Sequence, residues 1–120
     1  RITGYKTILK YKPEEFKANY EIGSVYGKVL HNIDSAIVYL SRAVLINPAS
    51  EVANRDLGVA FAMLGEYESS LPYFLKALEL NTNDPDNYIN LGITLRNLGQ
   101  KKQAQDLFVK AESLKRNQNK

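Results

Sequence analysis

Apolar residues recur along the chain at the three- and four-residue spacing of an amphipathic helix, and glycines interrupt this pattern at intervals. Leu57, Phe61 and Leu64 follow the helical spacing, and Gly65 interrupts it. A second apolar stripe follows directly and comprises Leu71, Phe74, Leu75 and Leu78. Stripes of this period predict amphipathic helices, and a glycine between two of them predicts a turn. We therefore predict a pair of helices joined by a short turn.

This passage occurs more than once in the chain. A pattern of Leu-Gly-x-x-apolar-x-x-Leu-Gly lies at residues 57–65 and again at residues 91–99, a period of 34 residues. The register continues without a gap, because Phe74 corresponds to Phe108 across the same interval. A register held over this length predicts repeated structural units that stack on one another.

A third copy of the pattern precedes these two. Gly23 and Ala43 match Gly58 and Ala77, but the interval between them is one residue longer. We expect the extra residue in the turn around residues 30–34.

Each 34-residue period contains Leu-Gly, then an aromatic residue or leucine, then a turn glycine and finally small-x-x-x-Phe-x-x-Ala. This pattern resembles the tetratricopeptide repeat, a helix-turn-helix unit. The resemblance covers essentially the whole chain, as a half repeat followed by three full repeats. It implies an all-α fold, a right-handed α-solenoid of about seven helices in stacked antiparallel pairs.

We accordingly predict a single domain at residues 1–115. Residues 1–15 are expected to hold the second helix of a truncated repeat, because they match only the second half of the pattern. The full repeats are predicted at residues 16–50, 51–84 and 85–115. The last repeat is expected to be self-capping, which means that its own outer face is polar. Residues 116–120 are predicted to form a disordered tail.

The two ends of the predicted array differ in polarity. Leu71 and Leu78, which would face a following repeat, are replaced at the equivalent places in the last repeat by Gln105 and Glu112. A polar outer face is typical of a terminal repeat, so we expect the array to end there. The N-terminal end begins in mid-pattern, as if cut from a longer chain. Its apolar residues, such as Ile8, predict a homodimer in which a second copy covers them.

The formal net charge of +3 conceals two basic ends and an acidic middle. Residues 1–17 carry five basic and two acidic groups, residues 18–99 carry five and nine, and residues 100–120 carry six and two. A nucleic-acid interface normally needs a continuous basic face, whereas the C-terminal lysines are confined to one predicted helix and the tail. Apolar stretches stay well below the roughly 18–20 residues of a membrane span. We therefore expect no nucleic-acid partner and no membrane insertion by this segment.

The sequence contains no recognisable catalytic constellation. Ser50 and Asp84 lie at predicted helix starts, where side-chain oxygens cap backbone N–H groups, and this position also explains the acidic pair of Asp84 with Asp86. His31 is the single histidine and lies in a predicted turn, and cysteine is absent. Neither a Gly-x-Ser-x-Gly motif nor a glycine-rich phosphate loop occurs. We therefore predict no enzyme activity, no cofactor and no metal.

The resemblance also implies where a partner binds. In tetratricopeptide-like arrays the first helix of each pair lines a concave groove, which receives an extended peptide or a partner helix. Transferred by position, the groove residues are Tyr20, Ser24, Arg55, Asp56, Val59, Ile89, Asn90, Ile93, Arg96 and Asn97, with Lys28 and Met63 on the same helix faces. Two of them, Arg55 and Arg96, can hold a carboxylate bidentately, which predicts a protein or peptide partner with an acidic group. An ordinary solvated surface is the alternative interpretation of these positions.

One subset of the family grips the acidic C-terminal tail of chaperones with lysine, asparagine and arginine side chains. The corresponding positions of this chain are Tyr20, Ser24, Asp56, Asp86 and Asn90. Because these departures remove the clamp, we do not predict a chaperone-tail adaptor.

The sequence thus predicts a non-catalytic interaction or assembly module that binds a peptide or partner helix in its groove. The alternative is a regulatory or substrate-docking C-terminal segment of a larger enzyme or membrane protein, whose catalytic part lies upstream. The compartment is unknown, with the cytoplasm as the default expectation for a soluble domain.

Overall fold

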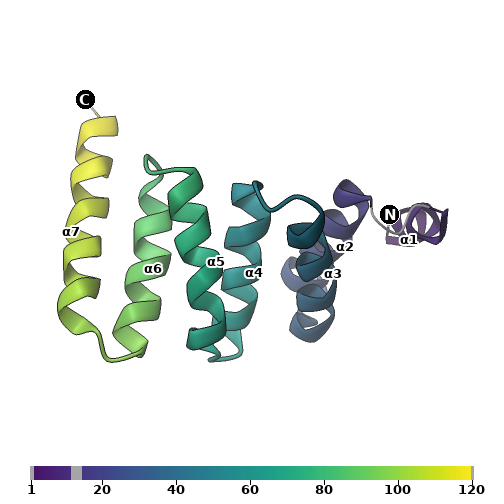
Figure 1. Ribbon diagram of the computed structural model, residues 1–120, viewed down its shortest axis with the longest axis horizontal. Coiled ribbons are helices and arrows are strands. Elements are labelled where there is room, and N and C mark those ends of the chain that lie inside the picture. Colours follow the sequence, from purple (N-terminus) through teal and green to yellow (C-terminus); the bar gives the residue numbers. More distant parts are fainter. Residues whose placement is uncertain (1, 12–14, 120) are drawn as a thin grey trace.

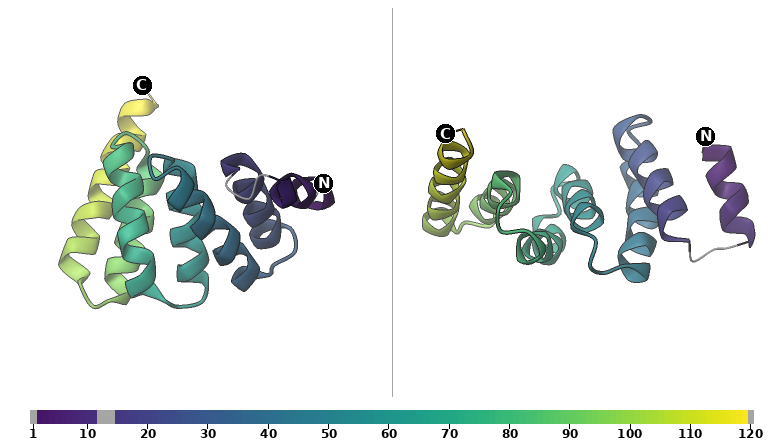
Figure 2. Two further views of the ribbon diagram at one scale, coloured as in Figure 1. Left: turned by 45° about the vertical axis from the view of Figure 1, so that its right-hand side comes forward. Right: turned by 90° about the horizontal axis from the view of Figure 1, so that it is seen from above.

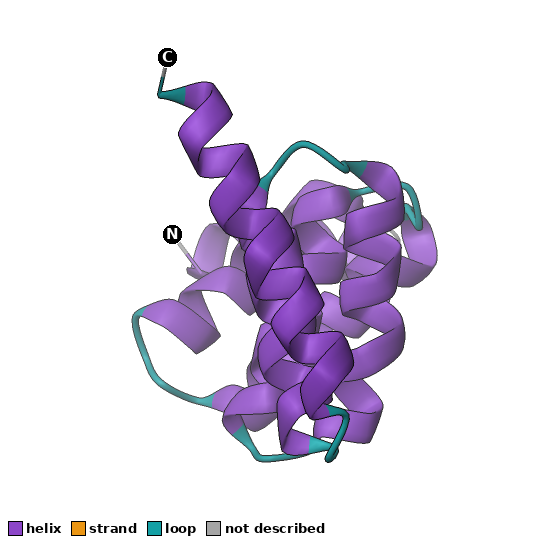
Figure 3. Ribbon diagram, turned by 90° about the vertical axis from the view of Figure 1, so that its left-hand side faces the viewer, coloured by secondary structure: helices purple, strands orange, loops and turns teal. Residues whose placement is uncertain are grey.

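The computed structural model describes residues 2–11 and 15–119, which form seven α-helices and no strand (Figure 1). The helices are α1 (Ile2–Tyr11), α2 (Phe16–Lys28), α3 (Ile33–Ile46), α4 (Glu51–Met63), α5 (Tyr67–Leu80), α6 (Pro85–Asn97) and α7 (Lys101–Gln118). They follow one another along the long axis of a body of 47 × 32 × 23 Å, from α1 at one end to α7 at the other. The end-on view of Figure 3 shows the same helices and loops. The predicted all-α solenoid is confirmed.

The helices are arranged as successive pairs, α2 with α3, α4 with α5, and α6 with α7, which lie in a row when seen from above (Figure 2). The first helices of neighbouring pairs touch, since α2 contacts α4 and α4 contacts α6. Among the described residues the backbones of α3, α5 and α7 do not come close to one another. We call the side where α2, α4 and α6 approach the inner side, and the side where α3, α5 and α7 are spaced apart the outer side.

Glycines let the two helices of each pair approach closely. A Cβ atom at Gly58 would lie 2.7 Å from the Phe74 ring, and one at Gly92 would lie 2.6 Å from the Phe108 ring. In the first pair, a Cβ at Gly23 would lie 2.7 Å from Leu40 Cγ. Glycine inside a helix costs about 1 kcal/mol relative to alanine, and the packing of the partner helix against the bare backbone offsets this cost.

The turns inside the pairs explain the extra residue of the first repeat. Gly65 and Gly99 adopt left-handed φ angles of 74° and 88° in turns of three residues. The turn between α2 and α3 comprises the four residues 29–32, so the insertion lies in the turn, as predicted. Its left-handed residue is His31, with a φ of 53°.

Side chains predicted to cap helices do so. The Ser50 hydroxyl accepts a hydrogen bond from the Ala53 N–H at 3.1 Å. The Asp84 carboxylate accepts one from the Asp86 N–H at 2.9 Å, and Pro85 occupies the first helical position. These contacts fix where α4 and α6 begin.

The C-terminal helix is longer than the sequence predicts. α7 continues through Gln118, so the expectation of a disordered tail from residue 116 is wrong for residues 116–118. Gln118 Nε2 donates to the Asn83 carbonyl at 2.7 Å, and this contact with the α5–α6 loop holds the last turn. Residue 120 lies outside the described residues.

At the opposite end, α1 packs against α2, where Lys6 Nζ lies 3.0 Å from the Tyr26 hydroxyl oxygen. The predicted half repeat at residues 1–15 includes residues 12–14, which lie outside the described residues. No helix in the described part of the chain has both the length and the apolar character needed to cross a membrane.

Candidate functional site

Two apolar pockets lie next to each other on the inner side. The first inner pocket, between α2, α3 and α4, has a volume of about 260 Å³. Its lining comprises Gly23, Ser24, Gly27, Lys28, His31, Ile33, Ala36, Leu40, Asp56, Val59, Ala60 and Met63. The second inner pocket, between α4, α5 and α6, has a volume of about 230 Å³. Its lining comprises Val59, Ala62, Met63, Tyr67, Phe74, Asn90, Ile93 and Thr94.

The two inner pockets are built from equivalent positions of successive repeats. Leu40 in the first pocket corresponds to Phe74 in the second, because each packs on the helical glycine of its own pair. Ile33 corresponds to Tyr67, because each is the first residue of the second helix. The pockets therefore follow from the repeat itself, and the side chains give each pocket its own shape.

α4 supplies the wall that the two inner pockets share. Val59 and Met63 line both of them. Met63 is 60% exposed, although it is a large apolar side chain. A polarizable, flexible side chain in this place is typical of an adaptable binding surface.

Five of the ten predicted groove residues line the inner pockets. They are Ser24, Asp56, Val59, Asn90 and Ile93. The residues that the prediction missed include Gly27, Ile33, Ala62 and Tyr67. Gly27 and Ala62 are equivalent small residues near the ends of α2 and α4, and the repeat register was the signal that would have located them.

A hydrogen-bonded group lies beside the first inner pocket. The Tyr20 hydroxyl donates to Asp56 Oδ2 at 2.8 Å, and Lys28 Nζ lies 3.6 Å from the same oxygen. Burial of the phenol, followed by its hydrogen bond to Asp56, raises the pKa of Tyr20 above its ordinary value. Tyr20 is therefore a donor that holds Asp56 in place at the pocket.

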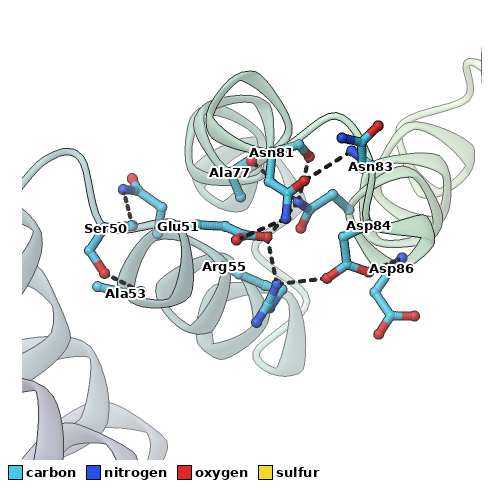
Figure 4. Close-up of polar contacts among 11 residues, drawn as sticks. Ser50, Glu51, Ala53, Arg55, Ala77, Asn81, Asn83, Asp84 and Asp86 are labelled. Carbon is cyan, nitrogen blue, oxygen red and sulfur yellow. Dashed lines mark hydrogen bonds and ion pairs between the residues drawn. The ribbon is translucent and has the colours of Figure 1, made fainter.

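Arg55 is engaged within the chain (Figure 4). Its Nη1 lies 3.0 Å from Glu51 Oε2 and 3.3 Å from Asp84 Oδ2. Glu51 also accepts hydrogen bonds from the amides of Asn81 and Asn87. The guanidinium that was predicted to take a partner's carboxylate thus already has two carboxylates of its own chain.

The remaining predicted residues lie on α6 and line neither inner pocket. Arg96 is exposed, and its guanidinium carbon lies 5.7 Å from the centre of the Phe108 ring. Asn97 Nδ2 donates to the Ile93 carbonyl of its own helix at 2.8 Å. Ile89 is half-buried.

The described residues contain no group of three or more histidine and carboxylate side chains that could hold a metal ion. The two inner pockets offer a concave shape, apolar surface and hydrogen-bonding groups.

Two family models describing the tetratricopeptide repeat match the chain, one at residues 56–84 and the other at residues 73–106. The chain contains tetratricopeptide repeats. Curated proteins gave no match.

Solved structures of MamA are similar to this tetratricopeptide repeat chain. A crystal structure of MamA is 28% identical, with a TM-score of 0.90, and the match covers 95% of this chain and 66% of that one. MamA from Desulfovibrio magneticus RS-1, from residue 41 to the end, is 27% identical with a TM-score of 0.89, covering 99% of this chain and 67% of that one. The chain spans slightly less than two thirds of the length of the first of these relatives.

Tetratricopeptide repeat proteins are generally non-enzymatic scaffolds for protein–protein interaction. The repeats and the likeness to MamA support a protein–protein interaction scaffold role for this chain.

Proposed function

We propose that the inner side binds a partner polypeptide that places one apolar side chain in each inner pocket. The observation that carries this proposal is the pair of adjoining, equivalent pockets that share Val59 and Met63. Covering an exposed apolar side chain such as Met63 removes it from water, which contributes about 25 cal/mol for each Å² buried. Because Val59 and Met63 separate the two pockets, the partner's two apolar side chains must lie at a fixed distance from each other.

The polar residues around the pockets support apolar anchoring in preference to a carboxylate clamp. Arg55 is paired with Glu51 and Asp84. Asp56 carries a negative charge into the lining of the first inner pocket and accepts from Tyr20. An acidic anchor in that pocket would face a like charge.

An acidic group of the partner would instead meet Arg96. This guanidinium is exposed and has no ion pair among the described residues. Arg96 occupies on α6 the position that Ala62, a lining residue of the second inner pocket, occupies on α4. A partner that extends past both pockets would bring a flanking carboxylate to it. The apolar anchors supply most of the affinity in this proposal, and the carboxylate sets the direction of the chain.

The test uses peptides selected from a random displayed library on the whole chain, with binding measured by fluorescence anisotropy. Met63→Glu is expected to weaken the selected peptides at least tenfold, because a charge then enters the wall of both pockets. Val52→Glu is the matched control, since Val52 is also an exposed apolar residue of α4 and lines neither pocket. Equal binding by the wild type and Met63→Glu would refute the proposal.

The exposed face of α1 supports a second proposal, pairing with another copy of the chain. Ile8 is 42% exposed, while Lys6 on the same helix contacts Tyr26 of α2. If this face forms a homodimer, Ile8→Asp gives a monomer by light scattering and keeps the helical circular dichroism signal. A wild-type chain that is already monomeric, or a variant that stays dimeric, rejects the pairing.

A further inference from the structure

A third pocket, the outer pocket, lies on the outer side, away from the two inner pockets. It has a volume of about 440 Å³ and lies between α5, α6 and α7. Its lining comprises Leu71, Leu75, Leu91, Leu95, Leu107, Gln103 and Asp106. Both α5 and α7 contact α6, but their own backbones do not come close to each other in the described part of the chain. The pocket thus opens between two outer helices, with α6 as its floor.

In the other two full repeats, stacked aromatic rings occupy the equivalent positions. Phe61 stacks on Tyr73, with ring centres 5.8 Å apart and an angle of 15° between the planes. Tyr26 stacks on Tyr39 in the same way, at 5.7 Å and 17°. The first ring of each pair comes three residues after the helical glycine, and the second directly precedes the residue that packs on that glycine.

The last repeat has two leucines at these positions. Leu95 comes three residues after Gly92, and Leu107 directly precedes Phe108. Both leucines line the outer pocket. Because two planar rings are replaced by smaller branched side chains, the outer side of this repeat is left with a pocket at the place of the missing rings.

We propose that the outer pocket binds a tyrosine side chain of a partner polypeptide. The ring would lie against the leucines and the phenol hydroxyl would donate to the carboxylate of Asp106. Tyr39 and Tyr73, the counterparts of Leu107, show that this position of the repeat accommodates a tyrosine. A volume of about 440 Å³ lies within the range of small-ligand pockets.

The polar and exposed residues of the outer pocket favour this occupant. Asp106 is the single charged residue of its lining and has no ion pair among the described residues. A carboxylate oxygen accepts a hydrogen bond from a phenol, which a purely aliphatic side chain cannot provide. Leu75 is 49% exposed, and a ring placed over it would remove it from water.

The probe is N-acetyl-tyrosinamide, titrated into the whole chain and followed by two-dimensional amide NMR. We expect shifts that saturate at millimolar concentration and are concentrated on residues of the outer pocket. N-acetyl-leucinamide is expected to cause little shift there. N-acetyl-phenylalaninamide is expected to bind about tenfold more weakly than the tyrosine compound, since it lacks the hydroxyl that donates to a charged acceptor.

Three variants test the assignment. Leu95→Phe with Leu107→Tyr restores the ring pair of the middle repeat, so it should raise the melting temperature and abolish binding. Leu75→Gln changes an exposed residue of the same lining and should weaken binding even if the double variant does not fold. Asp106→Ala should remove the preference for tyrosinamide over phenylalaninamide.

The proposal is overturned if tyrosinamide does not shift the pocket residues, or if leucinamide shifts them equally. The proposal is also overturned if the double variant Leu95→Phe with Leu107→Tyr folds and binds tyrosinamide as the wild type does. Shifts at the same residues that depend on protein concentration without probe would show that a second copy of the chain fills the pocket, which contradicts a partner's tyrosine as its occupant.

Discussion

The two junctions between full repeats share one apolar design but differ in the polar contacts that bridge them. At the junction of α2 with α4, the carboxylate of Asp56 connects the helices by accepting from Tyr20 and lying 3.6 Å from Lys28. Lys28 has a side chain that is 65% exposed. Exposed ion pairs contribute little stability, so the hydrogen bond from Tyr20 is the stronger of these two links.

The junction of α4 with α6 has a larger polar cluster. Glu51 accepts from Arg55, Asn81 and Asn87, and Arg55 also contacts Asp84. Asn87 is only 1% exposed and stands where the middle repeat has an alanine, five residues before the helical glycine. The comparison shows that apolar residues and glycines give every repeat the same helix packing, while polar side chains give each junction its own contacts.

The largest expected effect comes from the glycine inside the middle repeat, on helix α4, which belongs to both junctions. Gly58→Ala places a Cβ 2.7 Å from the Phe74 ring, and we expect it to lower the free energy of unfolding by about 1–3 kcal/mol despite the gain in helix propensity. Urea denaturation measures this loss. Gly4→Ala is the matched control, because a Cβ there meets nothing within 4 Å. A stabilising Gly58→Ala would contradict the close approach.

Removing the central carboxylate of each junction compares their polar contacts directly. Glu51→Ala removes the acceptor of three side chains and leaves buried Asn87 with fewer partners, so we expect a loss of about 2 kcal/mol. Asp56→Ala removes the acceptor of Tyr20, and we expect a loss of about 1 kcal/mol. Denaturation midpoints in urea rank the two variants. A larger loss from Asp56→Ala would reverse the comparison.

The turns inside the repeats provide a smaller effect of opposite sign. His31 has a left-handed φ of 53°, where the other two repeats have glycine. His31→Gly removes the steric cost of a side chain in this conformation, which is about 1 kcal/mol. Part of this stabilisation is offset, because glycine increases the conformational entropy of the unfolded chain. We expect a slightly higher melting temperature. Gly65→Ala, the reverse change in the middle repeat, should lower it.

The smallest expected effect is a pH dependence at the first junction. The pKa of Tyr20 is raised in the folded state, so its contribution to stability is fully present below the ordinary tyrosine pKa of about 10. The contribution is lost as the pH rises from there through the folded-state pKa, because only the unfolded chain ionises readily. Urea midpoints between neutral and strongly alkaline pH should fall less steeply in Tyr20→Phe than in the wild type. Parallel curves would exclude this linkage.

Features that repeat could be predicted from the sequence. The period located the helix pairs, Gly65 indicated the turn inside its pair, and the longer interval after Gly23 placed the insertion in its turn. Capping by Ser50 and Asp84 also followed from local chemistry. Each of these depends on short-range geometry that a residue and its neighbours determine.

Features that depend on particular side chains across a junction could not be predicted. Arg55 was expected to face a partner, but Asp84, 29 residues later, approaches it from the following loop. The end of α7 was also missed, because the apolar period ends before the helix does and the contact of Gln118 with Asn83 spans 35 residues. Side-chain contacts at such separations are set by the packed structure and leave no periodic signal.

The shared wall formed by Val59 and Met63 has a thermodynamic consequence. Since Met63 has three rotatable bonds and lines both inner pockets, a ligand that fixes its rotamer in one pocket also selects the shape of the other. Occupancy of the two pockets is then linked, and the coupling is reciprocal. A partner with one anchor would therefore change the affinity of the chain for a second, separate ligand without moving the backbone.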